Sequence, residues 1–166
     1  MIPRVRVKKT TFFTILFVFL IAALGIATFY SLEVPESNVD YRLGAEGAVF
    51  FGKAPITVAI ADTYSKRGEG LSGLSMLPQG HGLWFVFDEA DTHGIWMKDM
   101  LFPIDIIWLD SNFRVVGLSK NVSPGTYPQT FYPENPDRYV LEVNAGEADR
   151  LRVRIGAVAR MELYGE

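Results

Sequence analysis

The sequence predicts a mainly β fold: a single compact antiparallel β-barrel or sandwich-like domain with one or two short helices, preceded by an N-terminal transmembrane helix. Three observations lead to this prediction. A chain of 166 residues has room for one domain of ordinary size. Residues 12–30 form a long uncharged apolar run. From residue 54 onward, short apolar segments are separated by turn-forming residues, which is typical of small β domains.

The apolar run at residues 12–30, FFTILFVFLIAALGIATFY, has the length of a membrane-spanning helix. It would extend about 28 Å as a helix, close to the ~30 Å hydrocarbon core of a bilayer. Residues 1–11 contain four basic residues and no acidic one, which favours a cytoplasmic tail with the rest of the chain extracytoplasmic. The alternative is a cleaved signal peptide, because Gly25-Ile26-Ala27 is an acceptable cleavage site, and the domain would then be secreted.

The charge of the chain bounds its partners. The net charge is −3 and the basic tail contributes +4, which leaves −7 on the remaining residues. An acidic domain without a basic stripe is a poor partner for DNA or RNA, and we expect no nucleic-acid binding. The chain has no cysteine, which excludes a disulfide framework.

The region between the membrane segment and the domain has little periodicity. Residues 31–53 mix acids with proline and glycines, so we expect a linker there and the extracytoplasmic β domain at residues 54–166. Asp62 or Thr63 can cap a short helix that ends near Leu71.

The period-two pattern predicts the strands of the domain. Gly82–Phe87 is apolar on both faces and is expected to be a central strand. Residues 110–113 supply the turn of a hairpin between two of the strands. The other expected strands are 56–60, 95–97, 104–109, 115–118, 139–143 and 157–163, with a second short helix at 147–152.

Both histidines of the chain lie in the same phrase, His81-Gly-Leu-Trp84 and His93-Gly-Ile-Trp96. A turn at residues 88–92 would make the two phrases a hairpin, with Trp84 facing Trp96 and the histidines about 20 Å apart. Two ligands of one metal ion cannot be so far apart. We therefore interpret the histidines as strand entrances and expect neither a metal site nor a Ser-His-Asp triad.

Several short motifs, in order and spacing, resemble one protein family. They are Gly70-Leu-Ser-Gly73, Leu77-Pro78, Gly82–Phe87, Trp96-Met-Lys-Asp-Met100, Pro103-Ile-Asp105, Pro124, Tyr139-Val-Leu-Glu142 and Ala145-Gly146. The pattern covers residues 55–163 and is similar to the bacterial and archaeal family called domain of unknown function 192. The resemblance implies a compact, mainly β fold, commonly behind a signal or anchor, and implies no activity or cofactor.

The segment Trp96–Met100 offers a first set of candidate binding residues. Strand alternation would place Trp96 and Lys98 on one face, where Trp96 could stack on a ring and Lys98 could hold an anionic group. The alternative is a strand that leaves the core with its charges in water.

Two acidic residues inside apolar strands raise a second question. Asp105 shares a predicted strand face with Ile107 and Leu109, and Glu142 lies in a similar strand. A buried carboxylate needs a hydrogen-bonding partner or a raised pKa. Each is therefore a structural carboxylate, bonded to backbone amides or to a cation such as Lys98, or a ligand-holding or catalytic acid.

The proline-rich stretch at residues 120–138 is the third candidate. Its prolines exclude a helix or an interior strand, and loops of this length in compact domains are usually functional or disordered. Tyr127, Phe131 and Tyr132 are spaced through it, suited to binding a flat polar ligand such as a sugar ring or a peptide. The alternative is a lid that buries its own rings.

Together these features favour a membrane-anchored extracytoplasmic domain that acts as a binding or interaction module for an envelope glycan or a protein partner. The expected site comprises Trp96, Lys98, Asp105, Tyr127, Phe131, Tyr132 and Glu142. The sequence shows no complete catalytic constellation and no cofactor motif. The alternatives are a hydrolase that uses Asp105 with Glu142 or Asp99, with or without a divalent cation, and a structural role in an envelope complex.

Overall fold

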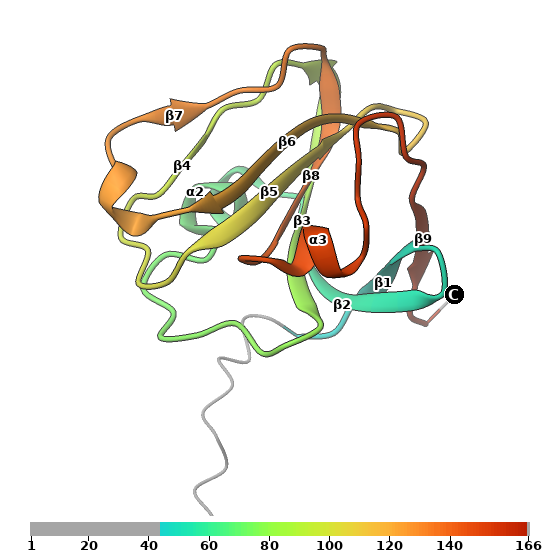
Figure 1. The fold of residues 1–166 in the computed structure, drawn as a ribbon, viewed down its shortest axis with the longest axis horizontal. Coiled ribbons are helices and arrows are strands. Elements are labelled where there is room, and N and C mark those ends of the chain that lie inside the picture. Colours follow the sequence, from blue (N-terminus) through green and yellow to red (C-terminus); the bar gives the residue numbers. More distant parts are fainter. Residues whose placement is uncertain (1–43, 166) are drawn as a thin grey trace, which may run out of the picture. The chain divides into compact units, whose positions relative to one another are not determined.

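The computed structural model describes residues 44–165, which form one open seven-stranded sheet, a two-stranded ribbon and two short α-helices. Figure 1 shows β4, β7 and α2 on one side of the strands β3, β8 and β5, with β1, β2, β9 and α3 on the other. The elements are β1 (Gly47–Phe51), β2 (Ala54–Ala61), α2 (Tyr64–Glu69), β3 (His81–Asp91), β4 (Ile95–Trp96), β5 (Ile104–Leu109), β6 (Val115–Val122), the 3-10 turn η2 (Pro124–Thr126), β7 (Thr130–Phe131), β8 (Asp137–Asn144), α3 (Glu147–Arg150) and β9 (Arg160–Leu163).

The strand order of the large sheet is β6-β5-β8-β3-β2-β1-β9, so the prediction of a mainly β fold is confirmed and that of a closed barrel is wrong. The two edge strands, β6 and β9, do not pair along their length. The residues at the start of β6 and before β9 are joined instead by a bridge between Arg114 and Val158 and by a few further backbone hydrogen bonds. The prediction of a purely antiparallel sheet is also wrong, because β2 and β3 pair in parallel. Parallel neighbours need a long crossover, which residues 62–80 supply together with α2.

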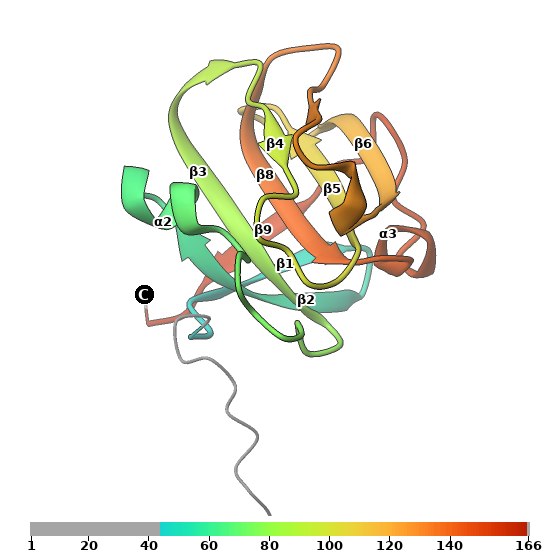
Figure 2. The ribbon, with the colours of Figure 1, turned by 90° about the vertical axis from the view of Figure 1, so that its left-hand side faces the viewer.

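Two apolar clusters lie on the two faces of the central strands. Directly paired residues share a face, and side chains alternate along each strand. The first cluster contains Leu83 and Ile106 and is covered by the ribbon of β4 and β7 and by the segment that follows α2. The second contains Trp84 and Leu141 and is closed by α3. In Figure 2, α2 and α3 lie on opposite sides of the domain.

Local sequence chemistry explains the elements that were predicted correctly. Thr63 is the N-cap of α2, and its side chain accepts a hydrogen bond from the backbone N–H of Lys66. Asp110 closes the hairpin between β5 and β6, because its carboxylate accepts hydrogen bonds from the backbone N–H groups of Asn112 and Arg114. The side chains of Thr63 and Asp110 thus accept hydrogen bonds from backbone N–H groups that would otherwise have no acceptor.

The expected hairpin between the two His-Gly-x-Trp phrases does not form. Residues 88–91 are not a turn but the exposed end of β3, which pairs with β8 and β2. Trp84 therefore lies opposite Leu141 and Ile60, while Trp96 pairs with Thr130 of β7. The histidines remain far apart, because His81 begins β3 and His93 follows its end. The three acidic residues in this stretch are typical of a turn, but the exposed end of a long strand tolerates them equally well.

The predictions for the N-terminal region are outside or at the edge of the described residues. The cytoplasmic tail (1–11) and the transmembrane segment (12–30) lie outside them. Within residues 44–165, no helix is long and apolar enough to cross a bilayer. The expected linker (31–53) extends too far, because Gly47–Phe51 forms β1, which pairs with β2 and β9.

Candidate functional site

A cleft opens between α2, the end of β3 and the short strand β4. Its inner and outer parts share Arg67, Gly68, Phe85, Gly94, Ile95 and Trp96. The inner part has a volume of about 60 Å³ and reaches the side chain of Glu142, and the outer part has about 350 Å³. We call these two parts together the Glu142 cleft.

The position of Glu142 in β8 directs its side chain toward this cleft. It lies opposite Leu83 of β3 and Ile106 of β5, so all three occupy the face of the first apolar cluster. Only 5% of Glu142 is exposed, and it lines the inner part of the cleft with Leu71 and Met100. The Glu142 carboxyl thus lies at the inner end of a cleft that is lined by apolar side chains and also by Arg67, Glu69 and Ser72.

No other described residue forms a hydrogen bond or an ion pair with the Glu142 carboxyl. Burial raises its pKa from 4.5 to about 8, and no hydrogen bond or neighbouring charge opposes this shift. Within residues 44–165, every fully enclosed side-chain oxygen or nitrogen has a hydrogen-bond partner. The unpartnered oxygens of Glu142 are therefore not fully enclosed and face the cleft. Near neutral pH the group is a neutral acid that can both donate and accept a hydrogen bond.

One wall of the cleft is a row of rings on β3 held against α2. Phe85 and Phe87 project on the same side, with ring centroids 6.5 Å apart. The Arg67 guanidinium lies 5.2 Å from the centre of the Phe87 ring. Its Nη1 donates to the carbonyl oxygens of Asp62 and Val86, at 2.8 Å each. These bonds fix α2 against β3 and hold a cation at the outer part of the cleft.

The other wall carries Trp96, whereas the three expected rings of the proline-rich loop line neither part of the cleft. Trp96 is 52% exposed and lines both parts of the cleft. Tyr127 packs edge-on against it, with ring centroids 6.3 Å apart. Phe131 pairs with Ile95 and packs against the first cluster, whereas Tyr132 is exposed and lies against Gly94. Of the three rings of the proline-rich loop, Phe131 is partly buried whereas Tyr127 and Tyr132 are exposed, so the loop does not bury all of its own rings.

Lys98 and Asp105 lie elsewhere. Lys98 is exposed beyond β4 and lines neither part of the cleft; its carbonyl oxygen accepts a hydrogen bond from Ser72. Asp105 is fully buried on the opposite face of the sheet from Glu142. Its two oxygens accept hydrogen bonds from the backbone N–H groups of Asn121, at 2.8 Å, and Ala148, at 2.9 Å. Asp105 thus joins β6 to α3 and is a structural carboxylate.

The separation of the two acids contradicts the alternative of a hydrolase that pairs Asp105 with Glu142. Asp105 and Glu142 come from adjacent strands but project to opposite faces, so they cannot act on one bond. Asp99 lies on the exposed turn after β4, at a left-handed backbone position. Among residues 44–165, no group of three acidic or histidine side chains is placed to hold a metal ion.

Sequence reasoning missed a histidine–aspartate pair beside the cleft. His93 Nδ1 lies 3.0 Å from a carboxylate oxygen of Asp137, and the His93 backbone N–H donates to the other oxygen. The imidazole stacks on Phe87 with ring centroids 3.5 Å apart. Burial of Asp137 raises the pKa of its carboxyl, against the lowering effect of the bonds from His93. The pair fixes the start of the β4 segment. The only sign of it in the sequence is that β8 begins with an acidic residue, Asp137.

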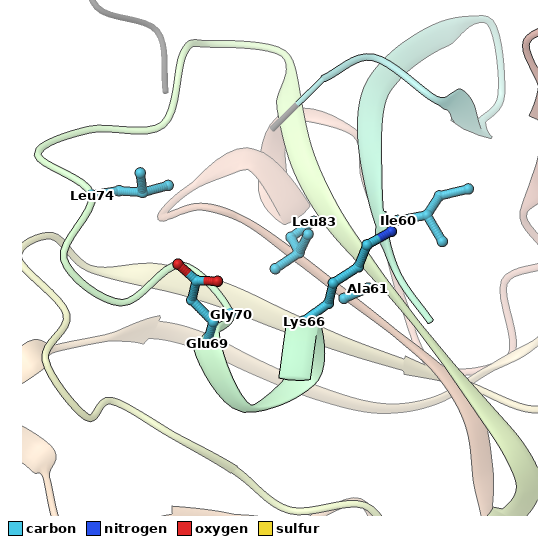
Figure 3. Close-up of a pocket in the computed structure, with 7 residues that line it drawn as sticks. All are labelled: Ile60, Ala61, Lys66, Glu69, Gly70, Leu74 and Leu83. Carbon is cyan, nitrogen blue, oxygen red and sulfur yellow. The ribbon is translucent and has the colours of Figure 1, made fainter. Parts of the chain in front are cut away.

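A second hollow, of about 210 Å³, lies on the other side of α2 (Figure 3). Its charged residues point in different directions, Lys66 toward Ile60 and Glu69 toward Leu74. Lys66 forms a salt bridge with Asp62 across the helix surface. No buried polar group lines this hollow, so it lacks the feature that distinguishes the Glu142 cleft.

The chain is similar to proteins without an assigned function. The DUF192 family model, described as uncharacterized, matches residues 48–161. A UPF0127 protein of Thermococcus sibiricus is 34% identical over 115 residues, which cover 67% of each chain. One of Thermococcus gammatolerans is 36% identical over 101 residues, or 60% of this chain and 62% of the relative, so the match spans less than two thirds of that relative.

Two crystal structures resemble the described fold. A protein of unknown function from Novosphingobium aromaticivorans has a TM-score of 0.62 at 26% identity, covering 70% of this chain and 83% of the other. A protein of Sinorhizobium meliloti, described as a candidate transcription regulator, has a TM-score of 0.64 at 28% identity, covering 73% and 94%.

Proposed function

The chain belongs to the uncharacterised DUF192 family, and we propose that its domain is a ligand-binding module of the cell envelope, with the Glu142 cleft as its binding site. The envelope location rests on the sequence alone, through the apolar run at residues 12–30 and the basic residues before it. In this proposal the N-terminal segment anchors the module and the domain meets its ligand outside the cytoplasm.

The observation that carries the proposal is the buried, unpartnered carboxyl of Glu142. Its oxygens open onto the cleft and have no hydrogen-bond partner among the described residues, so a ligand group that enters the inner part can form a hydrogen bond with them. A concavity that combines apolar side chains with a few polar groups, one of which has a perturbed pKa, is the usual form of a small-ligand site.

The dimensions of the cleft favour a small group or a chain end over a folded protein surface. Its inner part is narrow, and its outer part has the volume of a single ring with its substituents. The exposed face of Trp96 offers a stacking platform beside the opening. A glycan supplies flat C–H faces for such a platform together with polar groups for the floor, so an envelope glycan is the proposed ligand.

Tryptophan fluorescence provides the test, because Trp96 lines the cleft and is exposed. We expect a saturable change when the full chain, in a sugar-free detergent, is titrated with chitotriose or cellotriose. Trp96→Ala should abolish binding, measured by calorimetry. Tyr164→Ala is the matched control, because Tyr164 is equally exposed at 53% but lies after β9, away from the cleft. Loss of binding in both variants, or binding to neither sugar, would contradict the proposal.

A further inference from the structure

We infer that the Glu142 cleft recognises an N-acetylated sugar, whose acetamido group enters the inner part while its ring stacks on Trp96. This inference rests on the proposed binding function and names the class of ligand. Three features of the cleft carry it: the chemistry of the floor, the lining of the inner part and the platform at the opening.

The Glu142 carboxyl at the floor of the cleft favours a ligand group that is a neutral hydrogen-bond acceptor. The Glu142 carboxyl has no partner among the described residues, and its raised pKa keeps the proton on it near neutral pH. Its O–H can then donate to the carbonyl oxygen of an amide. The other charged residues that line the inner part are Arg67 and Glu69. A ligand ammonium group would require the buried Glu142 carboxyl to ionise, and it would have to share both parts of the cleft with the Arg67 guanidinium.

The lining of the inner part suits a methyl group beside that carbonyl. Leu71, Phe85, Ile95 and Met100 line this part together with Glu142, and each of these four is at most 8% exposed. Its polar lining residues besides Glu142 are Arg67, Glu69 and Ser72. The available 60 Å³ admits a group of a few heavy atoms but not a sugar ring. An acetamido group has this size, with an apolar end for these side chains and one carbonyl for Glu142.

The opening suits the ring that carries the acetamido group. Trp96 lines the inner and outer parts, so a group inserted beside Glu142 leaves its attached ring next to the indole. Tyr127 packs edge-on against the indole, and Trp96 remains 52% exposed. The C–H face of a pyranose packs on such a surface. A peptide amide would satisfy the floor but would leave this platform unused.

Titration of the full chain in a sugar-free detergent at pH 6.5 tests the inference. The probes are chitotriose, cellotriose, the glucosamine trimer and N-acetylalanine methylamide. We expect chitotriose to bind at least tenfold more tightly than each of the other three. Equal binding of cellotriose would overturn the role of the acetamido group while the glycan-binding proposal stands. Tighter binding of the glucosamine trimer would show that Glu142 acts as a carboxylate, and tighter binding of the methylamide would assign the cleft to peptides.

The pH dependence provides a second readout. If only protonated Glu142 donates to the acetamido carbonyl, a pKa of about 8 predicts that affinity for chitotriose falls about tenfold between pH 6.5 and pH 9. Glu142→Gln keeps an N–H donor at this position, so its affinity should not change over that range. Glu142→Leu should lose at least tenfold at pH 6.5. An equal pH dependence in wild type and Glu142→Gln would overturn the inference, and binding of none of the four probes would overturn the proposed function itself.

Discussion

Replacing Glu142 by glutamine should remove a pH-dependent loss of stability. The carboxyl has a pKa of about 8 in the folded protein and 4.5 as its ordinary value. The folded state therefore binds the proton more tightly than the unfolded state. The resulting stabilisation is fully present below pH 4.5 and is lost as the pH rises through 8, because ionisation then favours the unfolded chain. Glutamine has the same shape and does not titrate.

The expected size follows from the two pKa values. Between pH 5 and pH 9 they predict a loss of about 4 kcal/mol in the free energy of unfolding of wild type relative to Glu142→Gln. Other titrating groups, including the Asp137 carboxyl with its raised pKa, are common to both proteins and cancel in the comparison. The size is an upper estimate, since 5% of Glu142 remains exposed.

Urea unfolding followed by tryptophan fluorescence at pH 5, 7 and 9 measures this difference. Trp84 and Trp108 are buried and report on the core in both proteins. The difference between the two free energies of unfolding should change steadily with pH in favour of Glu142→Gln. A difference that stays within about 1 kcal/mol over the whole range would refute the reasoning, because a carboxyl with an ordinary pKa contributes no such slope.

Three further substitutions test the fold around the site. Asp105→Ala leaves two buried backbone amides without acceptors and should lower the free energy of unfolding by about 2–5 kcal/mol; a urea midpoint close to wild type would contradict its structural role. Gly82→Ala places a methyl group 2.8 Å from the backbone oxygen of Glu142 and should cost about 1–3 kcal/mol in the same assay, whereas an unchanged midpoint would mean that β3 and β8 are further apart. Thr63→Ala removes the N-cap of α2 and should cost about 1 kcal/mol, visible as faster hydrogen exchange of the α2 amides; unaltered exchange would show that the cap contributes nothing.

The sequence identified elements well and their partners poorly. Strands and caps depend on local chemistry, so β5, its hairpin with β6 and the Thr63 cap could be predicted. Strand pairing depends on residues far apart in the chain. The end of β3 at residues 88–91 carries exposed acids, which fit a turn and an exposed strand end equally well. Only the pairing of Asp91 with Asp137 decides between them.

The two buried acids also show that the sequence does not reveal contacts between residues far apart in the chain. Asp105 and Glu142 each stand in an apolar strand, and the sequence raised the same question for both. Alternation placed Asp105 on one face with Ile107 and Leu109, but it could not tell that Glu142 of the neighbouring strand projects from the opposite face. The acceptor role of Asp105 depends on Asn121 and Ala148, which later turns bring to it. Glu142 accepts no hydrogen bond from a backbone N–H group of the described residues. This difference distinguishes the acid of the candidate site from the structural acid Asp105.

The state of the Glu142 carboxyl is the most direct test of the account. Carbon-detected NMR of the glutamate side chains, with Glu142→Gln to assign the signal, gives the pKa of this group in the folded protein. The account predicts titration near pH 8 in the free protein and a further upward shift when chitotriose is bound, because the ligand stabilises the protonated form. Titration near pH 4.5 would contradict it, since the floor of the cleft would then be an ordinary hydrated carboxylate.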